Sequence, residues 1–306
     1  MDTISFKLLS SDVPGIDMFK HATSCLTCID NGYRYGYRYI RGKLKNFDVL
    51  VTDNYLKIYS GSLSKFYLDS NLTDLTSEDI CKSVHILSDY FQLPIERSFV
   101  QKLHYGINTI VDYDTTLYYP YLGNLGAFKR LEQPFGLNYK VQNRELVIYD
   151  KIRELKAHRE PIPSLFKDKH VIRVEMRYHR KLNDYFKLSE FRASTLFNPT
   201  FLDVLKNDLK TTYSKIPKIY SDNTIMEEIT TKRQLYIAGI VALIEKEGGI
   251  LKAINRLKER YKKGLLTKKQ FFDLKNIYNN CGYNNTSYLY ANSNLIEEFD
   301  SKFFDS

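Results

Sequence analysis

From about Ile4 to Ile58, apolar and polar residues alternate in short runs separated by turn residues. Residues that alternate in this way point to opposite faces of a β-strand. The segments from Asp48 to Val51 and from Tyr55 to Tyr59 show the pattern most clearly. The N-terminal part of the chain is therefore predicted to consist of short strands and turns.

A helix is predicted after these strands. Its apolar residues recur at helical spacing and are Ile80, Val84, Leu87 and Phe91. Thr76 can cap the first turn together with Asp79, and Pro94 marks the end of the helix. We expect the apolar side of this helix to pack on a sheet.

The segment from Leu103 to Tyr113 predicts a strand whose two faces differ in polarity. The first face carries Leu103, Tyr105, Ile107, Thr109 and Val111. The second face carries His104, Gly106, Asn108, Ile110 and Asp112. This second face is too polar for a plain hydrophobic core.

Two more strands are predicted, from Arg144 to Lys151 and from His170 to His179. The stretch from Asp114 to Pro134 is rich in turn residues and is predicted to be a loop. After about Leu188 the pattern becomes helical. The expected helices run from Lys232 to Glu247, from Ile250 to Lys263, and from Thr267, which forms a capping box with Gln270, to about Tyr278. These patterns predict an α+β domain over residues 1–190 and a helical domain over residues 191–306.

Composition points to a polyanionic partner. The 306 residues include 45 Lys and Arg against 36 Asp and Glu, which gives a net charge of +9. Nucleic acid is the first candidate and a membrane surface is the competitor. No apolar run approaches the ~20 residues of a spanning helix and no signal segment is visible, so we expect no membrane contact and a cytoplasmic location. The 25 Tyr and 18 Phe also fit stacking on unpaired bases.

A candidate catalytic pair lies where the strand from Arg144 ends. Alternation places Val147, Tyr149 and Lys151 on one face, so the phenol and the ammonium are expected about 7 Å apart, two strand steps. A tyrosine with its ordinary pKa near ~10 is a poor nucleophile. A nearby cation can favour the phenolate and can neutralise charge on a phosphoryl group. Tyr149 and Lys151 therefore suit attack on a phosphate.

The next strand carries a run of charges on one face, namely Arg173, Glu175 and Arg177. If Glu175 is buried, it can be an oxygen ligand for Mg²⁺ or Mn²⁺, while the arginines bind phosphates. The alternative is a ladder of ion pairs on the protein surface.

Together these segments resemble a known family. The residues from Leu146 to Leu155, followed by Val171 to Arg177, resemble the paired motifs of the filamentous-phage gene II replication initiators. The first motif is also similar to the Tyr-Asp-Lys motif of rolling-circle plasmid initiators. Ser62 to Phe66 and Asn71 to Leu75 resemble the segment that precedes these motifs in the phage family. The resemblance covers roughly Ser60 to Leu182.

The resemblance implies a fold and a function. The fold would be similar to that of HUH endonucleases, with helices on one face of an antiparallel sheet that carries the nicking site. Tyr149 would attack one strand at a replication origin, leaving a 5′-phosphotyrosine and a 3′-OH that primes a host polymerase. Other implied partners are single-stranded and duplex origin DNA, a host helicase and a second copy of the chain in a homodimer. The residues expected to contact DNA are Arg173, Arg177, Lys65 and Arg153.

Two features depart from the family pattern. The phage proteins carry Arg-Ile-Asp where this chain has Gly106, Ile107 and Asn108. Many nicking enzymes also have two histidines separated by one residue, and none of the six histidines forms such a pair. Glu175 is therefore the first expected ligand of Mg²⁺ or Mn²⁺, followed by Asn108 and His104.

Several alternatives remain open. Tyr139 and the cluster from Tyr118 to Tyr121 are rival nucleophiles. The Lys-rich stretch from Lys252 to Lys269 is either a solvated helix face or a surface for duplex DNA. The same chemistry would serve a mobilisation relaxase at a transfer origin. A non-enzymatic origin-binding protein or repressor would use the basic surface without cleavage.

Overall fold

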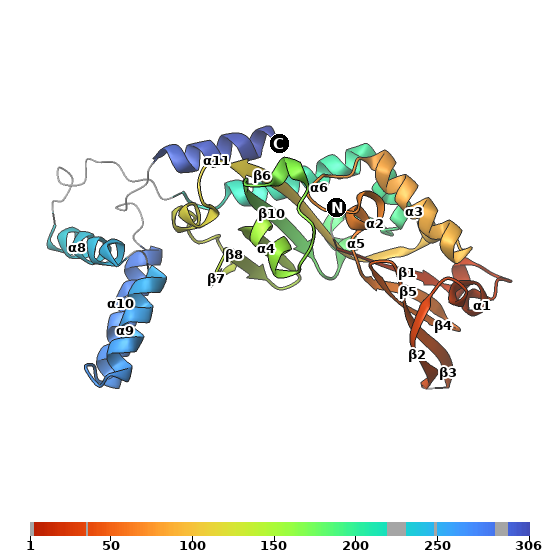
Figure 1. Ribbon diagram of the computed structural model, residues 1–306, viewed down its shortest axis with the longest axis horizontal. Coiled ribbons are helices and arrows are strands. Elements are labelled where there is room, and N and C mark those ends of the chain that lie inside the picture. The colour runs from red at the N-terminus through yellow and green to blue at the C-terminus, as the bar shows by residue number, and fades with distance from the viewer. Residues whose placement is uncertain (1–2, 35, 219–230, 248–249, 285–292) are drawn as a thin grey trace.

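Ten strands form one antiparallel sheet in the order β2-β3-β4-β5-β1-β6-β10-β9-β8-β7 (Figure 1). The computed structural model describes residues 3–34, 36–218, 231–247, 250–284 and 293–306. The strands are β1 (Ile4–Leu9), β2 (Thr27–Arg34), β3 (Tyr37–Leu44), β4 (Phe47–Thr52), β5 (Tyr55–Ser60), β6 (Phe99–Val111), β7 (Lys129–Gln133), β8 (Gly136–Val141), β9 (Arg144–Asp150) and β10 (His170–Tyr178). The expected α+β class with an antiparallel sheet is confirmed.

Strand β6 joins the two halves of this sheet. It is 13 residues long, and its first part, Phe99 to Leu103, pairs with β1. Its second part, Leu103 to Val111, pairs with β10. The N-terminal strands and the strands that carry Tyr149 and Glu175 therefore belong to one continuous surface.

One face of the sheet is covered by helices. The helices α1 (Met18–Thr23), α2 (Leu63–Leu68), α3 (Ser77–Phe91), α6 (Pro199–Ser214) and α11 (Ser293–Asp305) share one hydrophobic core with it. The predicted apolar face of β6 lies in this core, as Leu103 and Ile107 show. α3 begins with the expected capping box of Thr76 and Asp79. Helix α4 (Lys151–Ala157) packs against β10, and its buried Ile152 and Leu155 lie outside this core, which places α4 on the opposite face (Figure 1).

The stretch from Asp114 to Pro134 is more ordered than predicted. It contains two short 3-10 helices, Thr115–Leu117 and Tyr119–Tyr121, and then strand β7. The sequence of β7, Lys-Arg-Leu-Glu-Gln, contains one apolar residue, so no alternation of apolar and polar residues predicts a strand there. β8 was also missed. Its first residue, Gly136, lies so close to β9 that an added Cβ would come within 2.4 Å of the Ile148 carbonyl oxygen.

The C-terminal helices fall into two groups. α6 and α11 belong to the main core together with the sheet. α8 (Lys232–Lys246), α9 (Ile250–Lys262) and α10 (Lys268–Asn284) form a separate small core. The helices α6 and α11 follow the predicted boundary at residue 190 in the sequence but pack with the sheet that precedes it. The assignment of two domains stays a prediction. No helix in the described ranges is long and apolar enough to cross a membrane.

Candidate functional site

The polar face of β6, β9 and β10 lies opposite the helix-covered core. In the register of these strands, Arg173 faces Tyr149 on one side and Asn108 on the other. One row further, Glu175 faces Val147 and Gly106. In the third row, Arg177 faces Glu145 and His104. The structure therefore brings the predicted nucleophile, the three predicted metal ligands and two predicted phosphate-binding arginines into three neighbouring rows.

Glu175 is the centre of this cluster. Its side chain is only 1% exposed, and both carboxylate oxygens accept hydrogen bonds. Arg173 Nε donates to Oε2 at 2.9 Å and Arg177 Nε donates to Oε1 at 2.7 Å. The hydroxyl of Tyr149 donates to Oε2 at 3.2 Å. The surface ladder considered as an alternative is thus wrong for Arg173 and Glu175, because both are buried.

Charge and burial act in opposite directions on Glu175. Burial alone would raise its pKa, but the hydrogen bond from His104 and the charges of Arg173 and Arg177 outweigh burial and hold the pKa well below its ordinary value. Glu175 is therefore an anion at neutral pH. Such a carboxylate orients the Tyr149 hydroxyl but is a weak base.

His104 completes the cluster from β6. Its Nδ1 lies 3.4 Å from Glu175 Oε1, and burial lowers the pKa of the imidazole despite the neighbouring carboxylate. The neutral tautomer that fits carries its proton on Nδ1. Its Nε2 is buried and has no hydrogen-bond partner among the described residues.

Gly106 makes room for this arrangement. A Cβ at this position would lie 3.0 Å from three atoms of the Arg173 guanidinium. Arg173 can therefore lie flat across β6 and reach the Asn108 side chain, where Nη1 donates to Oδ1 at 3.1 Å. The departure from the family pattern at Gly106 has a physical reason in this chain.

The alternation predicted that Lys151 lies on the same strand as Tyr149, and this prediction is wrong. β9 ends at Asp150, whose side chain caps α4 by accepting a hydrogen bond from the Arg153 backbone nitrogen. Lys151 is the first residue of α4 and is fully buried. Its Nζ donates to Glu154 at 2.7 Å and lies 5.9 Å from the centre of the Tyr149 ring. The Lys151 ammonium and the Tyr149 ring are therefore close together, as expected, but the start of α4 rather than strand alternation brings them together.

Two of the three expected metal ligands, Glu175 and Asn108, do not fit a divalent ion in this arrangement, which leaves His104 Nε2 as the remaining candidate ligand atom. Both oxygens of Glu175 are held by arginines. Asn108 Oδ1 accepts from Arg173, and its Nδ2 donates to the carbonyls of Asn71 and Leu72. Within the described parts of the chain, no group of three or more His, Cys, Asp or Glu residues is placed to hold a metal. The requirement for Mg²⁺ or Mn²⁺ itself stays a prediction.

The four residues expected to contact DNA differ in accessibility. Arg173 is buried and acts inside the cluster, whereas the Arg177 side chain is 29% exposed and can reach a bound phosphate. Lys65 pairs with Glu160 at 2.6 Å. Arg153 pairs with Asp114 at 2.8 Å and with Asp150.

Three of the four rival tyrosines, Tyr118, Tyr119 and Tyr139, are buried in the main core. Tyr139 is fully buried, and its hydroxyl donates to the Gly123 carbonyl at 2.8 Å. Burial raises the pKa of Tyr139 to about 12. Tyr118 is also fully buried and donates to Glu298, and burial raises its pKa and that of Tyr119. Tyr149 is only half-buried and lies on the polar face, so it is more accessible than Tyr118, Tyr119 and Tyr139. Tyr121 is also half-buried, but it packs against the main core.

Three further residues border the site and were not singled out from the sequence. The rings of His179 and His104 lie 5.8 Å apart in an edge-to-face arrangement. His179 Nε2 lies 3.6 Å from Glu145 Oε2. Burial and the nearby charge of Arg177 lower the pKa of Lys102. The alternation of β10 already placed His179 on the polar face, but its neighbours come from other strands.

Comparison with models of known protein families gives no match for this chain, and comparison with curated proteins gives none either. The chemistry of the site is therefore what indicates its function. The site combines a hydroxyl held by an anion, two guanidiniums and a buried ammonium. Such a set can position a nucleophile beside a phosphate and neutralise the charge that develops on it.

We predict that Glu175→Gln lowers the free energy of unfolding by about 3–5 kcal/mol, because it leaves the buried Arg173 charge without its counterion. Urea unfolding followed by circular dichroism measures this loss. The control is Glu78→Gln, whose exposed pair with Lys82 should contribute within about 0.5 kcal/mol. Equal losses in the two variants would contradict the assignment of Glu175 as a structural anion.

The depressed pKa of Glu175 also predicts how this difference depends on pH. A carboxylate with a lowered pKa stabilises the fold above its unfolded pKa of about 4.3, and that stability is lost as the pH falls toward the folded pKa. The stability difference between the native chain and Glu175→Gln should stay constant from pH 7 to about pH 5 and shrink below about pH 4. Unfolding curves at several pH values test this, and a difference that grows on acidification would refute it.

Proposed function

We propose that the protein is a rolling-circle replication initiator that nicks one DNA strand through Tyr149. The observation that supports this most is the hydrogen bond of the Tyr149 hydroxyl to Glu175, 3.2 Å long, beside two arginines. The net charge of +9 suits a DNA substrate. The resemblance of the two motifs to the gene II initiators agrees with the same role.

In the proposed reaction, the Tyr149 oxygen attacks the scissile phosphorus and forms a 5′-phosphotyrosyl bond. The bond from phosphorus to the 3′ oxygen breaks, and this oxygen leaves as the free 3′-OH after taking up a proton. The phenol proton goes to water, because Glu175 is a weak base. Arg177, which is partly exposed, neutralises charge on the phosphoryl oxygens. Lys151 stabilises the phenolate from the side of the ring.

The remaining parts of the proposal come from the resemblance. They are a Mg²⁺ or Mn²⁺ cofactor, single-stranded and duplex origin DNA, a host helicase and polymerase, a homodimer and a cytoplasmic location. We derive no step through the metal, because the expected ligands are engaged by Arg173, Arg177 and backbone carbonyls.

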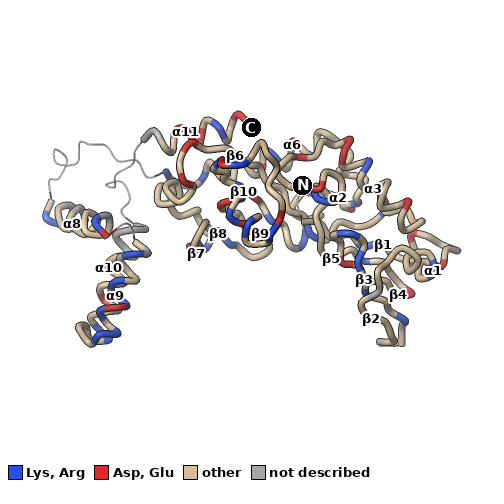
Figure 2. Tube along the Cα trace, in the orientation of Figure 1, with Lys and Arg blue, Asp and Glu red and all other residues tan. Residues whose placement is uncertain are grey.

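A binding-only function is the second candidate, and one observation favours it. Exposed lysines and arginines run along α9 and continue into the start of α10 (Figure 2). On α9 the apolar Ala253 and Leu257 are buried, so the helix directs its cations away from the small core. This surface can hold duplex phosphates without cleavage.

We predict that Tyr149→Phe abolishes nicking and covalent attachment to DNA, because the attacking oxygen is missing. The assay uses a supercoiled plasmid that carries the DNA flanking this gene, with Mg²⁺ or Mn²⁺, and detects the adduct by its mass. The free energy of unfolding should fall by only about 1 kcal/mol, since one hydrogen bond is lost.

The matched control is Tyr139→Phe, which removes a buried hydroxyl from the rival tyrosine and should leave nicking intact in whatever protein remains folded. Undiminished relaxation by Tyr149→Phe would eliminate Tyr149 as the nucleophile. Lack of nicking by the unchanged protein on its own origin would favour the binding-only function.

We also predict that charge reversal on α9 weakens duplex binding. Lys258→Glu with Lys262→Glu should reduce the slope of log affinity against log salt by about 2, because each lysine neutralises about one phosphate. The control is Lys20→Glu with Lys187→Glu, which changes the net charge equally at exposed positions elsewhere. Equal effects of both pairs would indicate that only net charge matters.

A further inference from the structure

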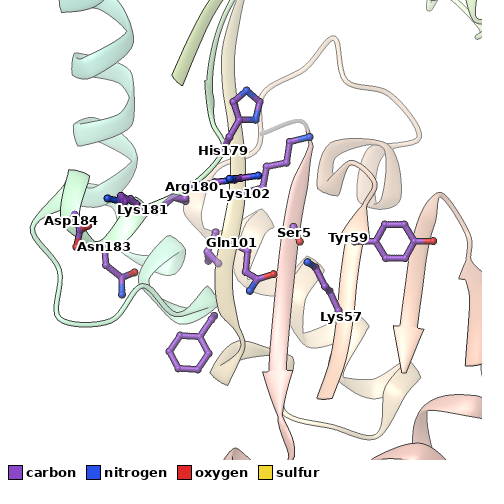
Figure 3. Close-up of a pocket in the computed structure, with 13 residues that line it drawn as sticks. Ser5, Lys57, Tyr59, Gln101, Lys102, His179, Arg180, Lys181, Asn183 and Asp184 are labelled. Carbon is purple, nitrogen blue, oxygen red and sulfur yellow. The ribbon is translucent and has the colours of Figure 1, made fainter. Parts of the chain in front are cut away.

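The polar face of the sheet continues from the candidate site into the N-terminal strands. Two hollows lie on it, with volumes of about 660 Å³ and 690 Å³. The first lies between β1, β5, β6, the turn after β10 and the start of helix α5 (Leu182–Phe186) (Figure 3). The second lies over β2 to β5. Lys57 and Tyr59 line both hollows, so the two form one continuous track.

The register of the strands shows why these side chains share one face. Ser5 pairs with Lys102 on β6, and Lys7 pairs with Lys57 on β5. Leu50 of β4 pairs with Lys57 and also with Arg41 of β3. No helix contributes a residue to the lining of the second hollow. The polar face of β2 to β5 is thus open at this hollow, whereas helices cover the opposite face of the sheet.

The track is lined mainly by cations and tyrosines. The cations are Arg41, Lys57, Lys102, Arg180 and Lys181, and the tyrosines are Tyr37, Tyr39, Tyr55 and Tyr59. The carboxylates of the lining are Asp30, which accepts a hydrogen bond from the Tyr39 hydroxyl, and the exposed Asp184. Positive charge therefore dominates, and aromatic rings lie among the cations.

Lys57 and Lys102 have no carboxylate oxygen within 4.0 Å in the described part of the chain, although the charges of Glu175 and Glu145 act on Lys102 from further away. Neither forms an ion pair there, and both are only half-exposed. Burial and the nearby charge of Lys7 lower the pKa of Lys57. Burial and the nearby charge of Arg177 lower the pKa of Lys102. A bound anion would relieve this repulsion, so the protein holds these ammonium groups in place without an internal partner.

We propose that this track binds an unpaired DNA strand, with phosphates on Lys57, Lys102 and Arg180 and bases against Tyr59 and Tyr39. Cationic grooves with aromatic side chains bind single strands because phosphates need charge and every base offers a face for stacking. The choice of DNA rests on the proposed function.

The dimensions suit this ligand. From β3 to β10 the track crosses five strand spacings of ~4.8 Å, or roughly 24 Å. This length accommodates the lower end of the ~4–16 nucleotide sites that single-strand-binding folds use. His179 lines the track and lies six residues from Arg173 along β10, which is about 20 Å from the row of Tyr149. A strand held in the track can therefore continue to the nucleophile.

The test is binding of a fluorescent 20-nucleotide oligo-dT to the full chain carrying Tyr149→Phe, measured by anisotropy at several salt concentrations. Because this background cannot cleave, failure of the nicking proposal and failure of the track give different results. Lys57→Glu with Lys102→Glu should weaken binding at least tenfold and reduce the salt slope by about 1.4, at about 0.7 for each phosphate contact. Tyr59→Ala should weaken binding at least fivefold without changing the slope, because stacking involves no counterion release.

The matched control is Lys20→Glu with Lys82→Glu, which makes the same change in net charge on α1 and α3, on the covered side of the sheet. The control should bind as tightly as the background protein, and circular dichroism confirms that each variant is folded. Normal binding by Lys57→Glu with Lys102→Glu would overturn the proposal. It would also be overturned if the control lost as much affinity, or if a 20-base-pair duplex competed equally and was equally sensitive to Tyr59→Ala.

Discussion

A buried carboxylate between two guanidiniums is the interaction on which the arrangement of the central strands depends. Glu175 and Arg173 are each 1% exposed, and burial of such charges is costly unless every group is paired. Their partners come from three strands, since His104 and Asn108 lie on β6, Tyr149 on β9 and Arg177 on β10. A shift of one residue in either pairing would turn these partners into the apolar core. The ion network therefore selects one register for β6, β9 and β10.

The same constraint separates the two faces of the sheet. With the charges on one side, the described helices of the main core pack on the other, and α4 covers the charged cluster together with the backbone of Asn71 and Leu72. The rest of the polar face extends toward Lys102 and Lys57, where the start of helix α5 borders the hollow. Tyr149, the arginines and the cationic track thus lie on one surface because the core occupies the opposite one.

Periodicity predicted the elements whose residues are buried on one side. β4, β5, β10 and α3 agree closely with their patterns, and the polar face of β6 was expected from its alternation. The burial of Arg173 was not predictable, because it depends on Gly106 and on the distant carbonyl of Asn71. The return of α11 to the main core is equally non-local. The helical position of Lys151 was within reach of the sequence, since Asp150 is a favourable N-cap residue.

The two departures from the gene II pattern have a common physical explanation. An arginine at position 106 would place a second guanidinium where the Arg173 side chain lies, 3.0 Å from the Gly106 Cβ position. An aspartate at position 108 would add a carboxylate that competes with Glu175 for Arg173. Gly106 and Asn108 instead leave Glu175 as the one carboxylate bonded to both Arg173 and Arg177 in the described structure. The absence of a charged pair at positions 106 and 108 of β6 and the burial of Arg173 on β10 therefore belong to the same packing arrangement.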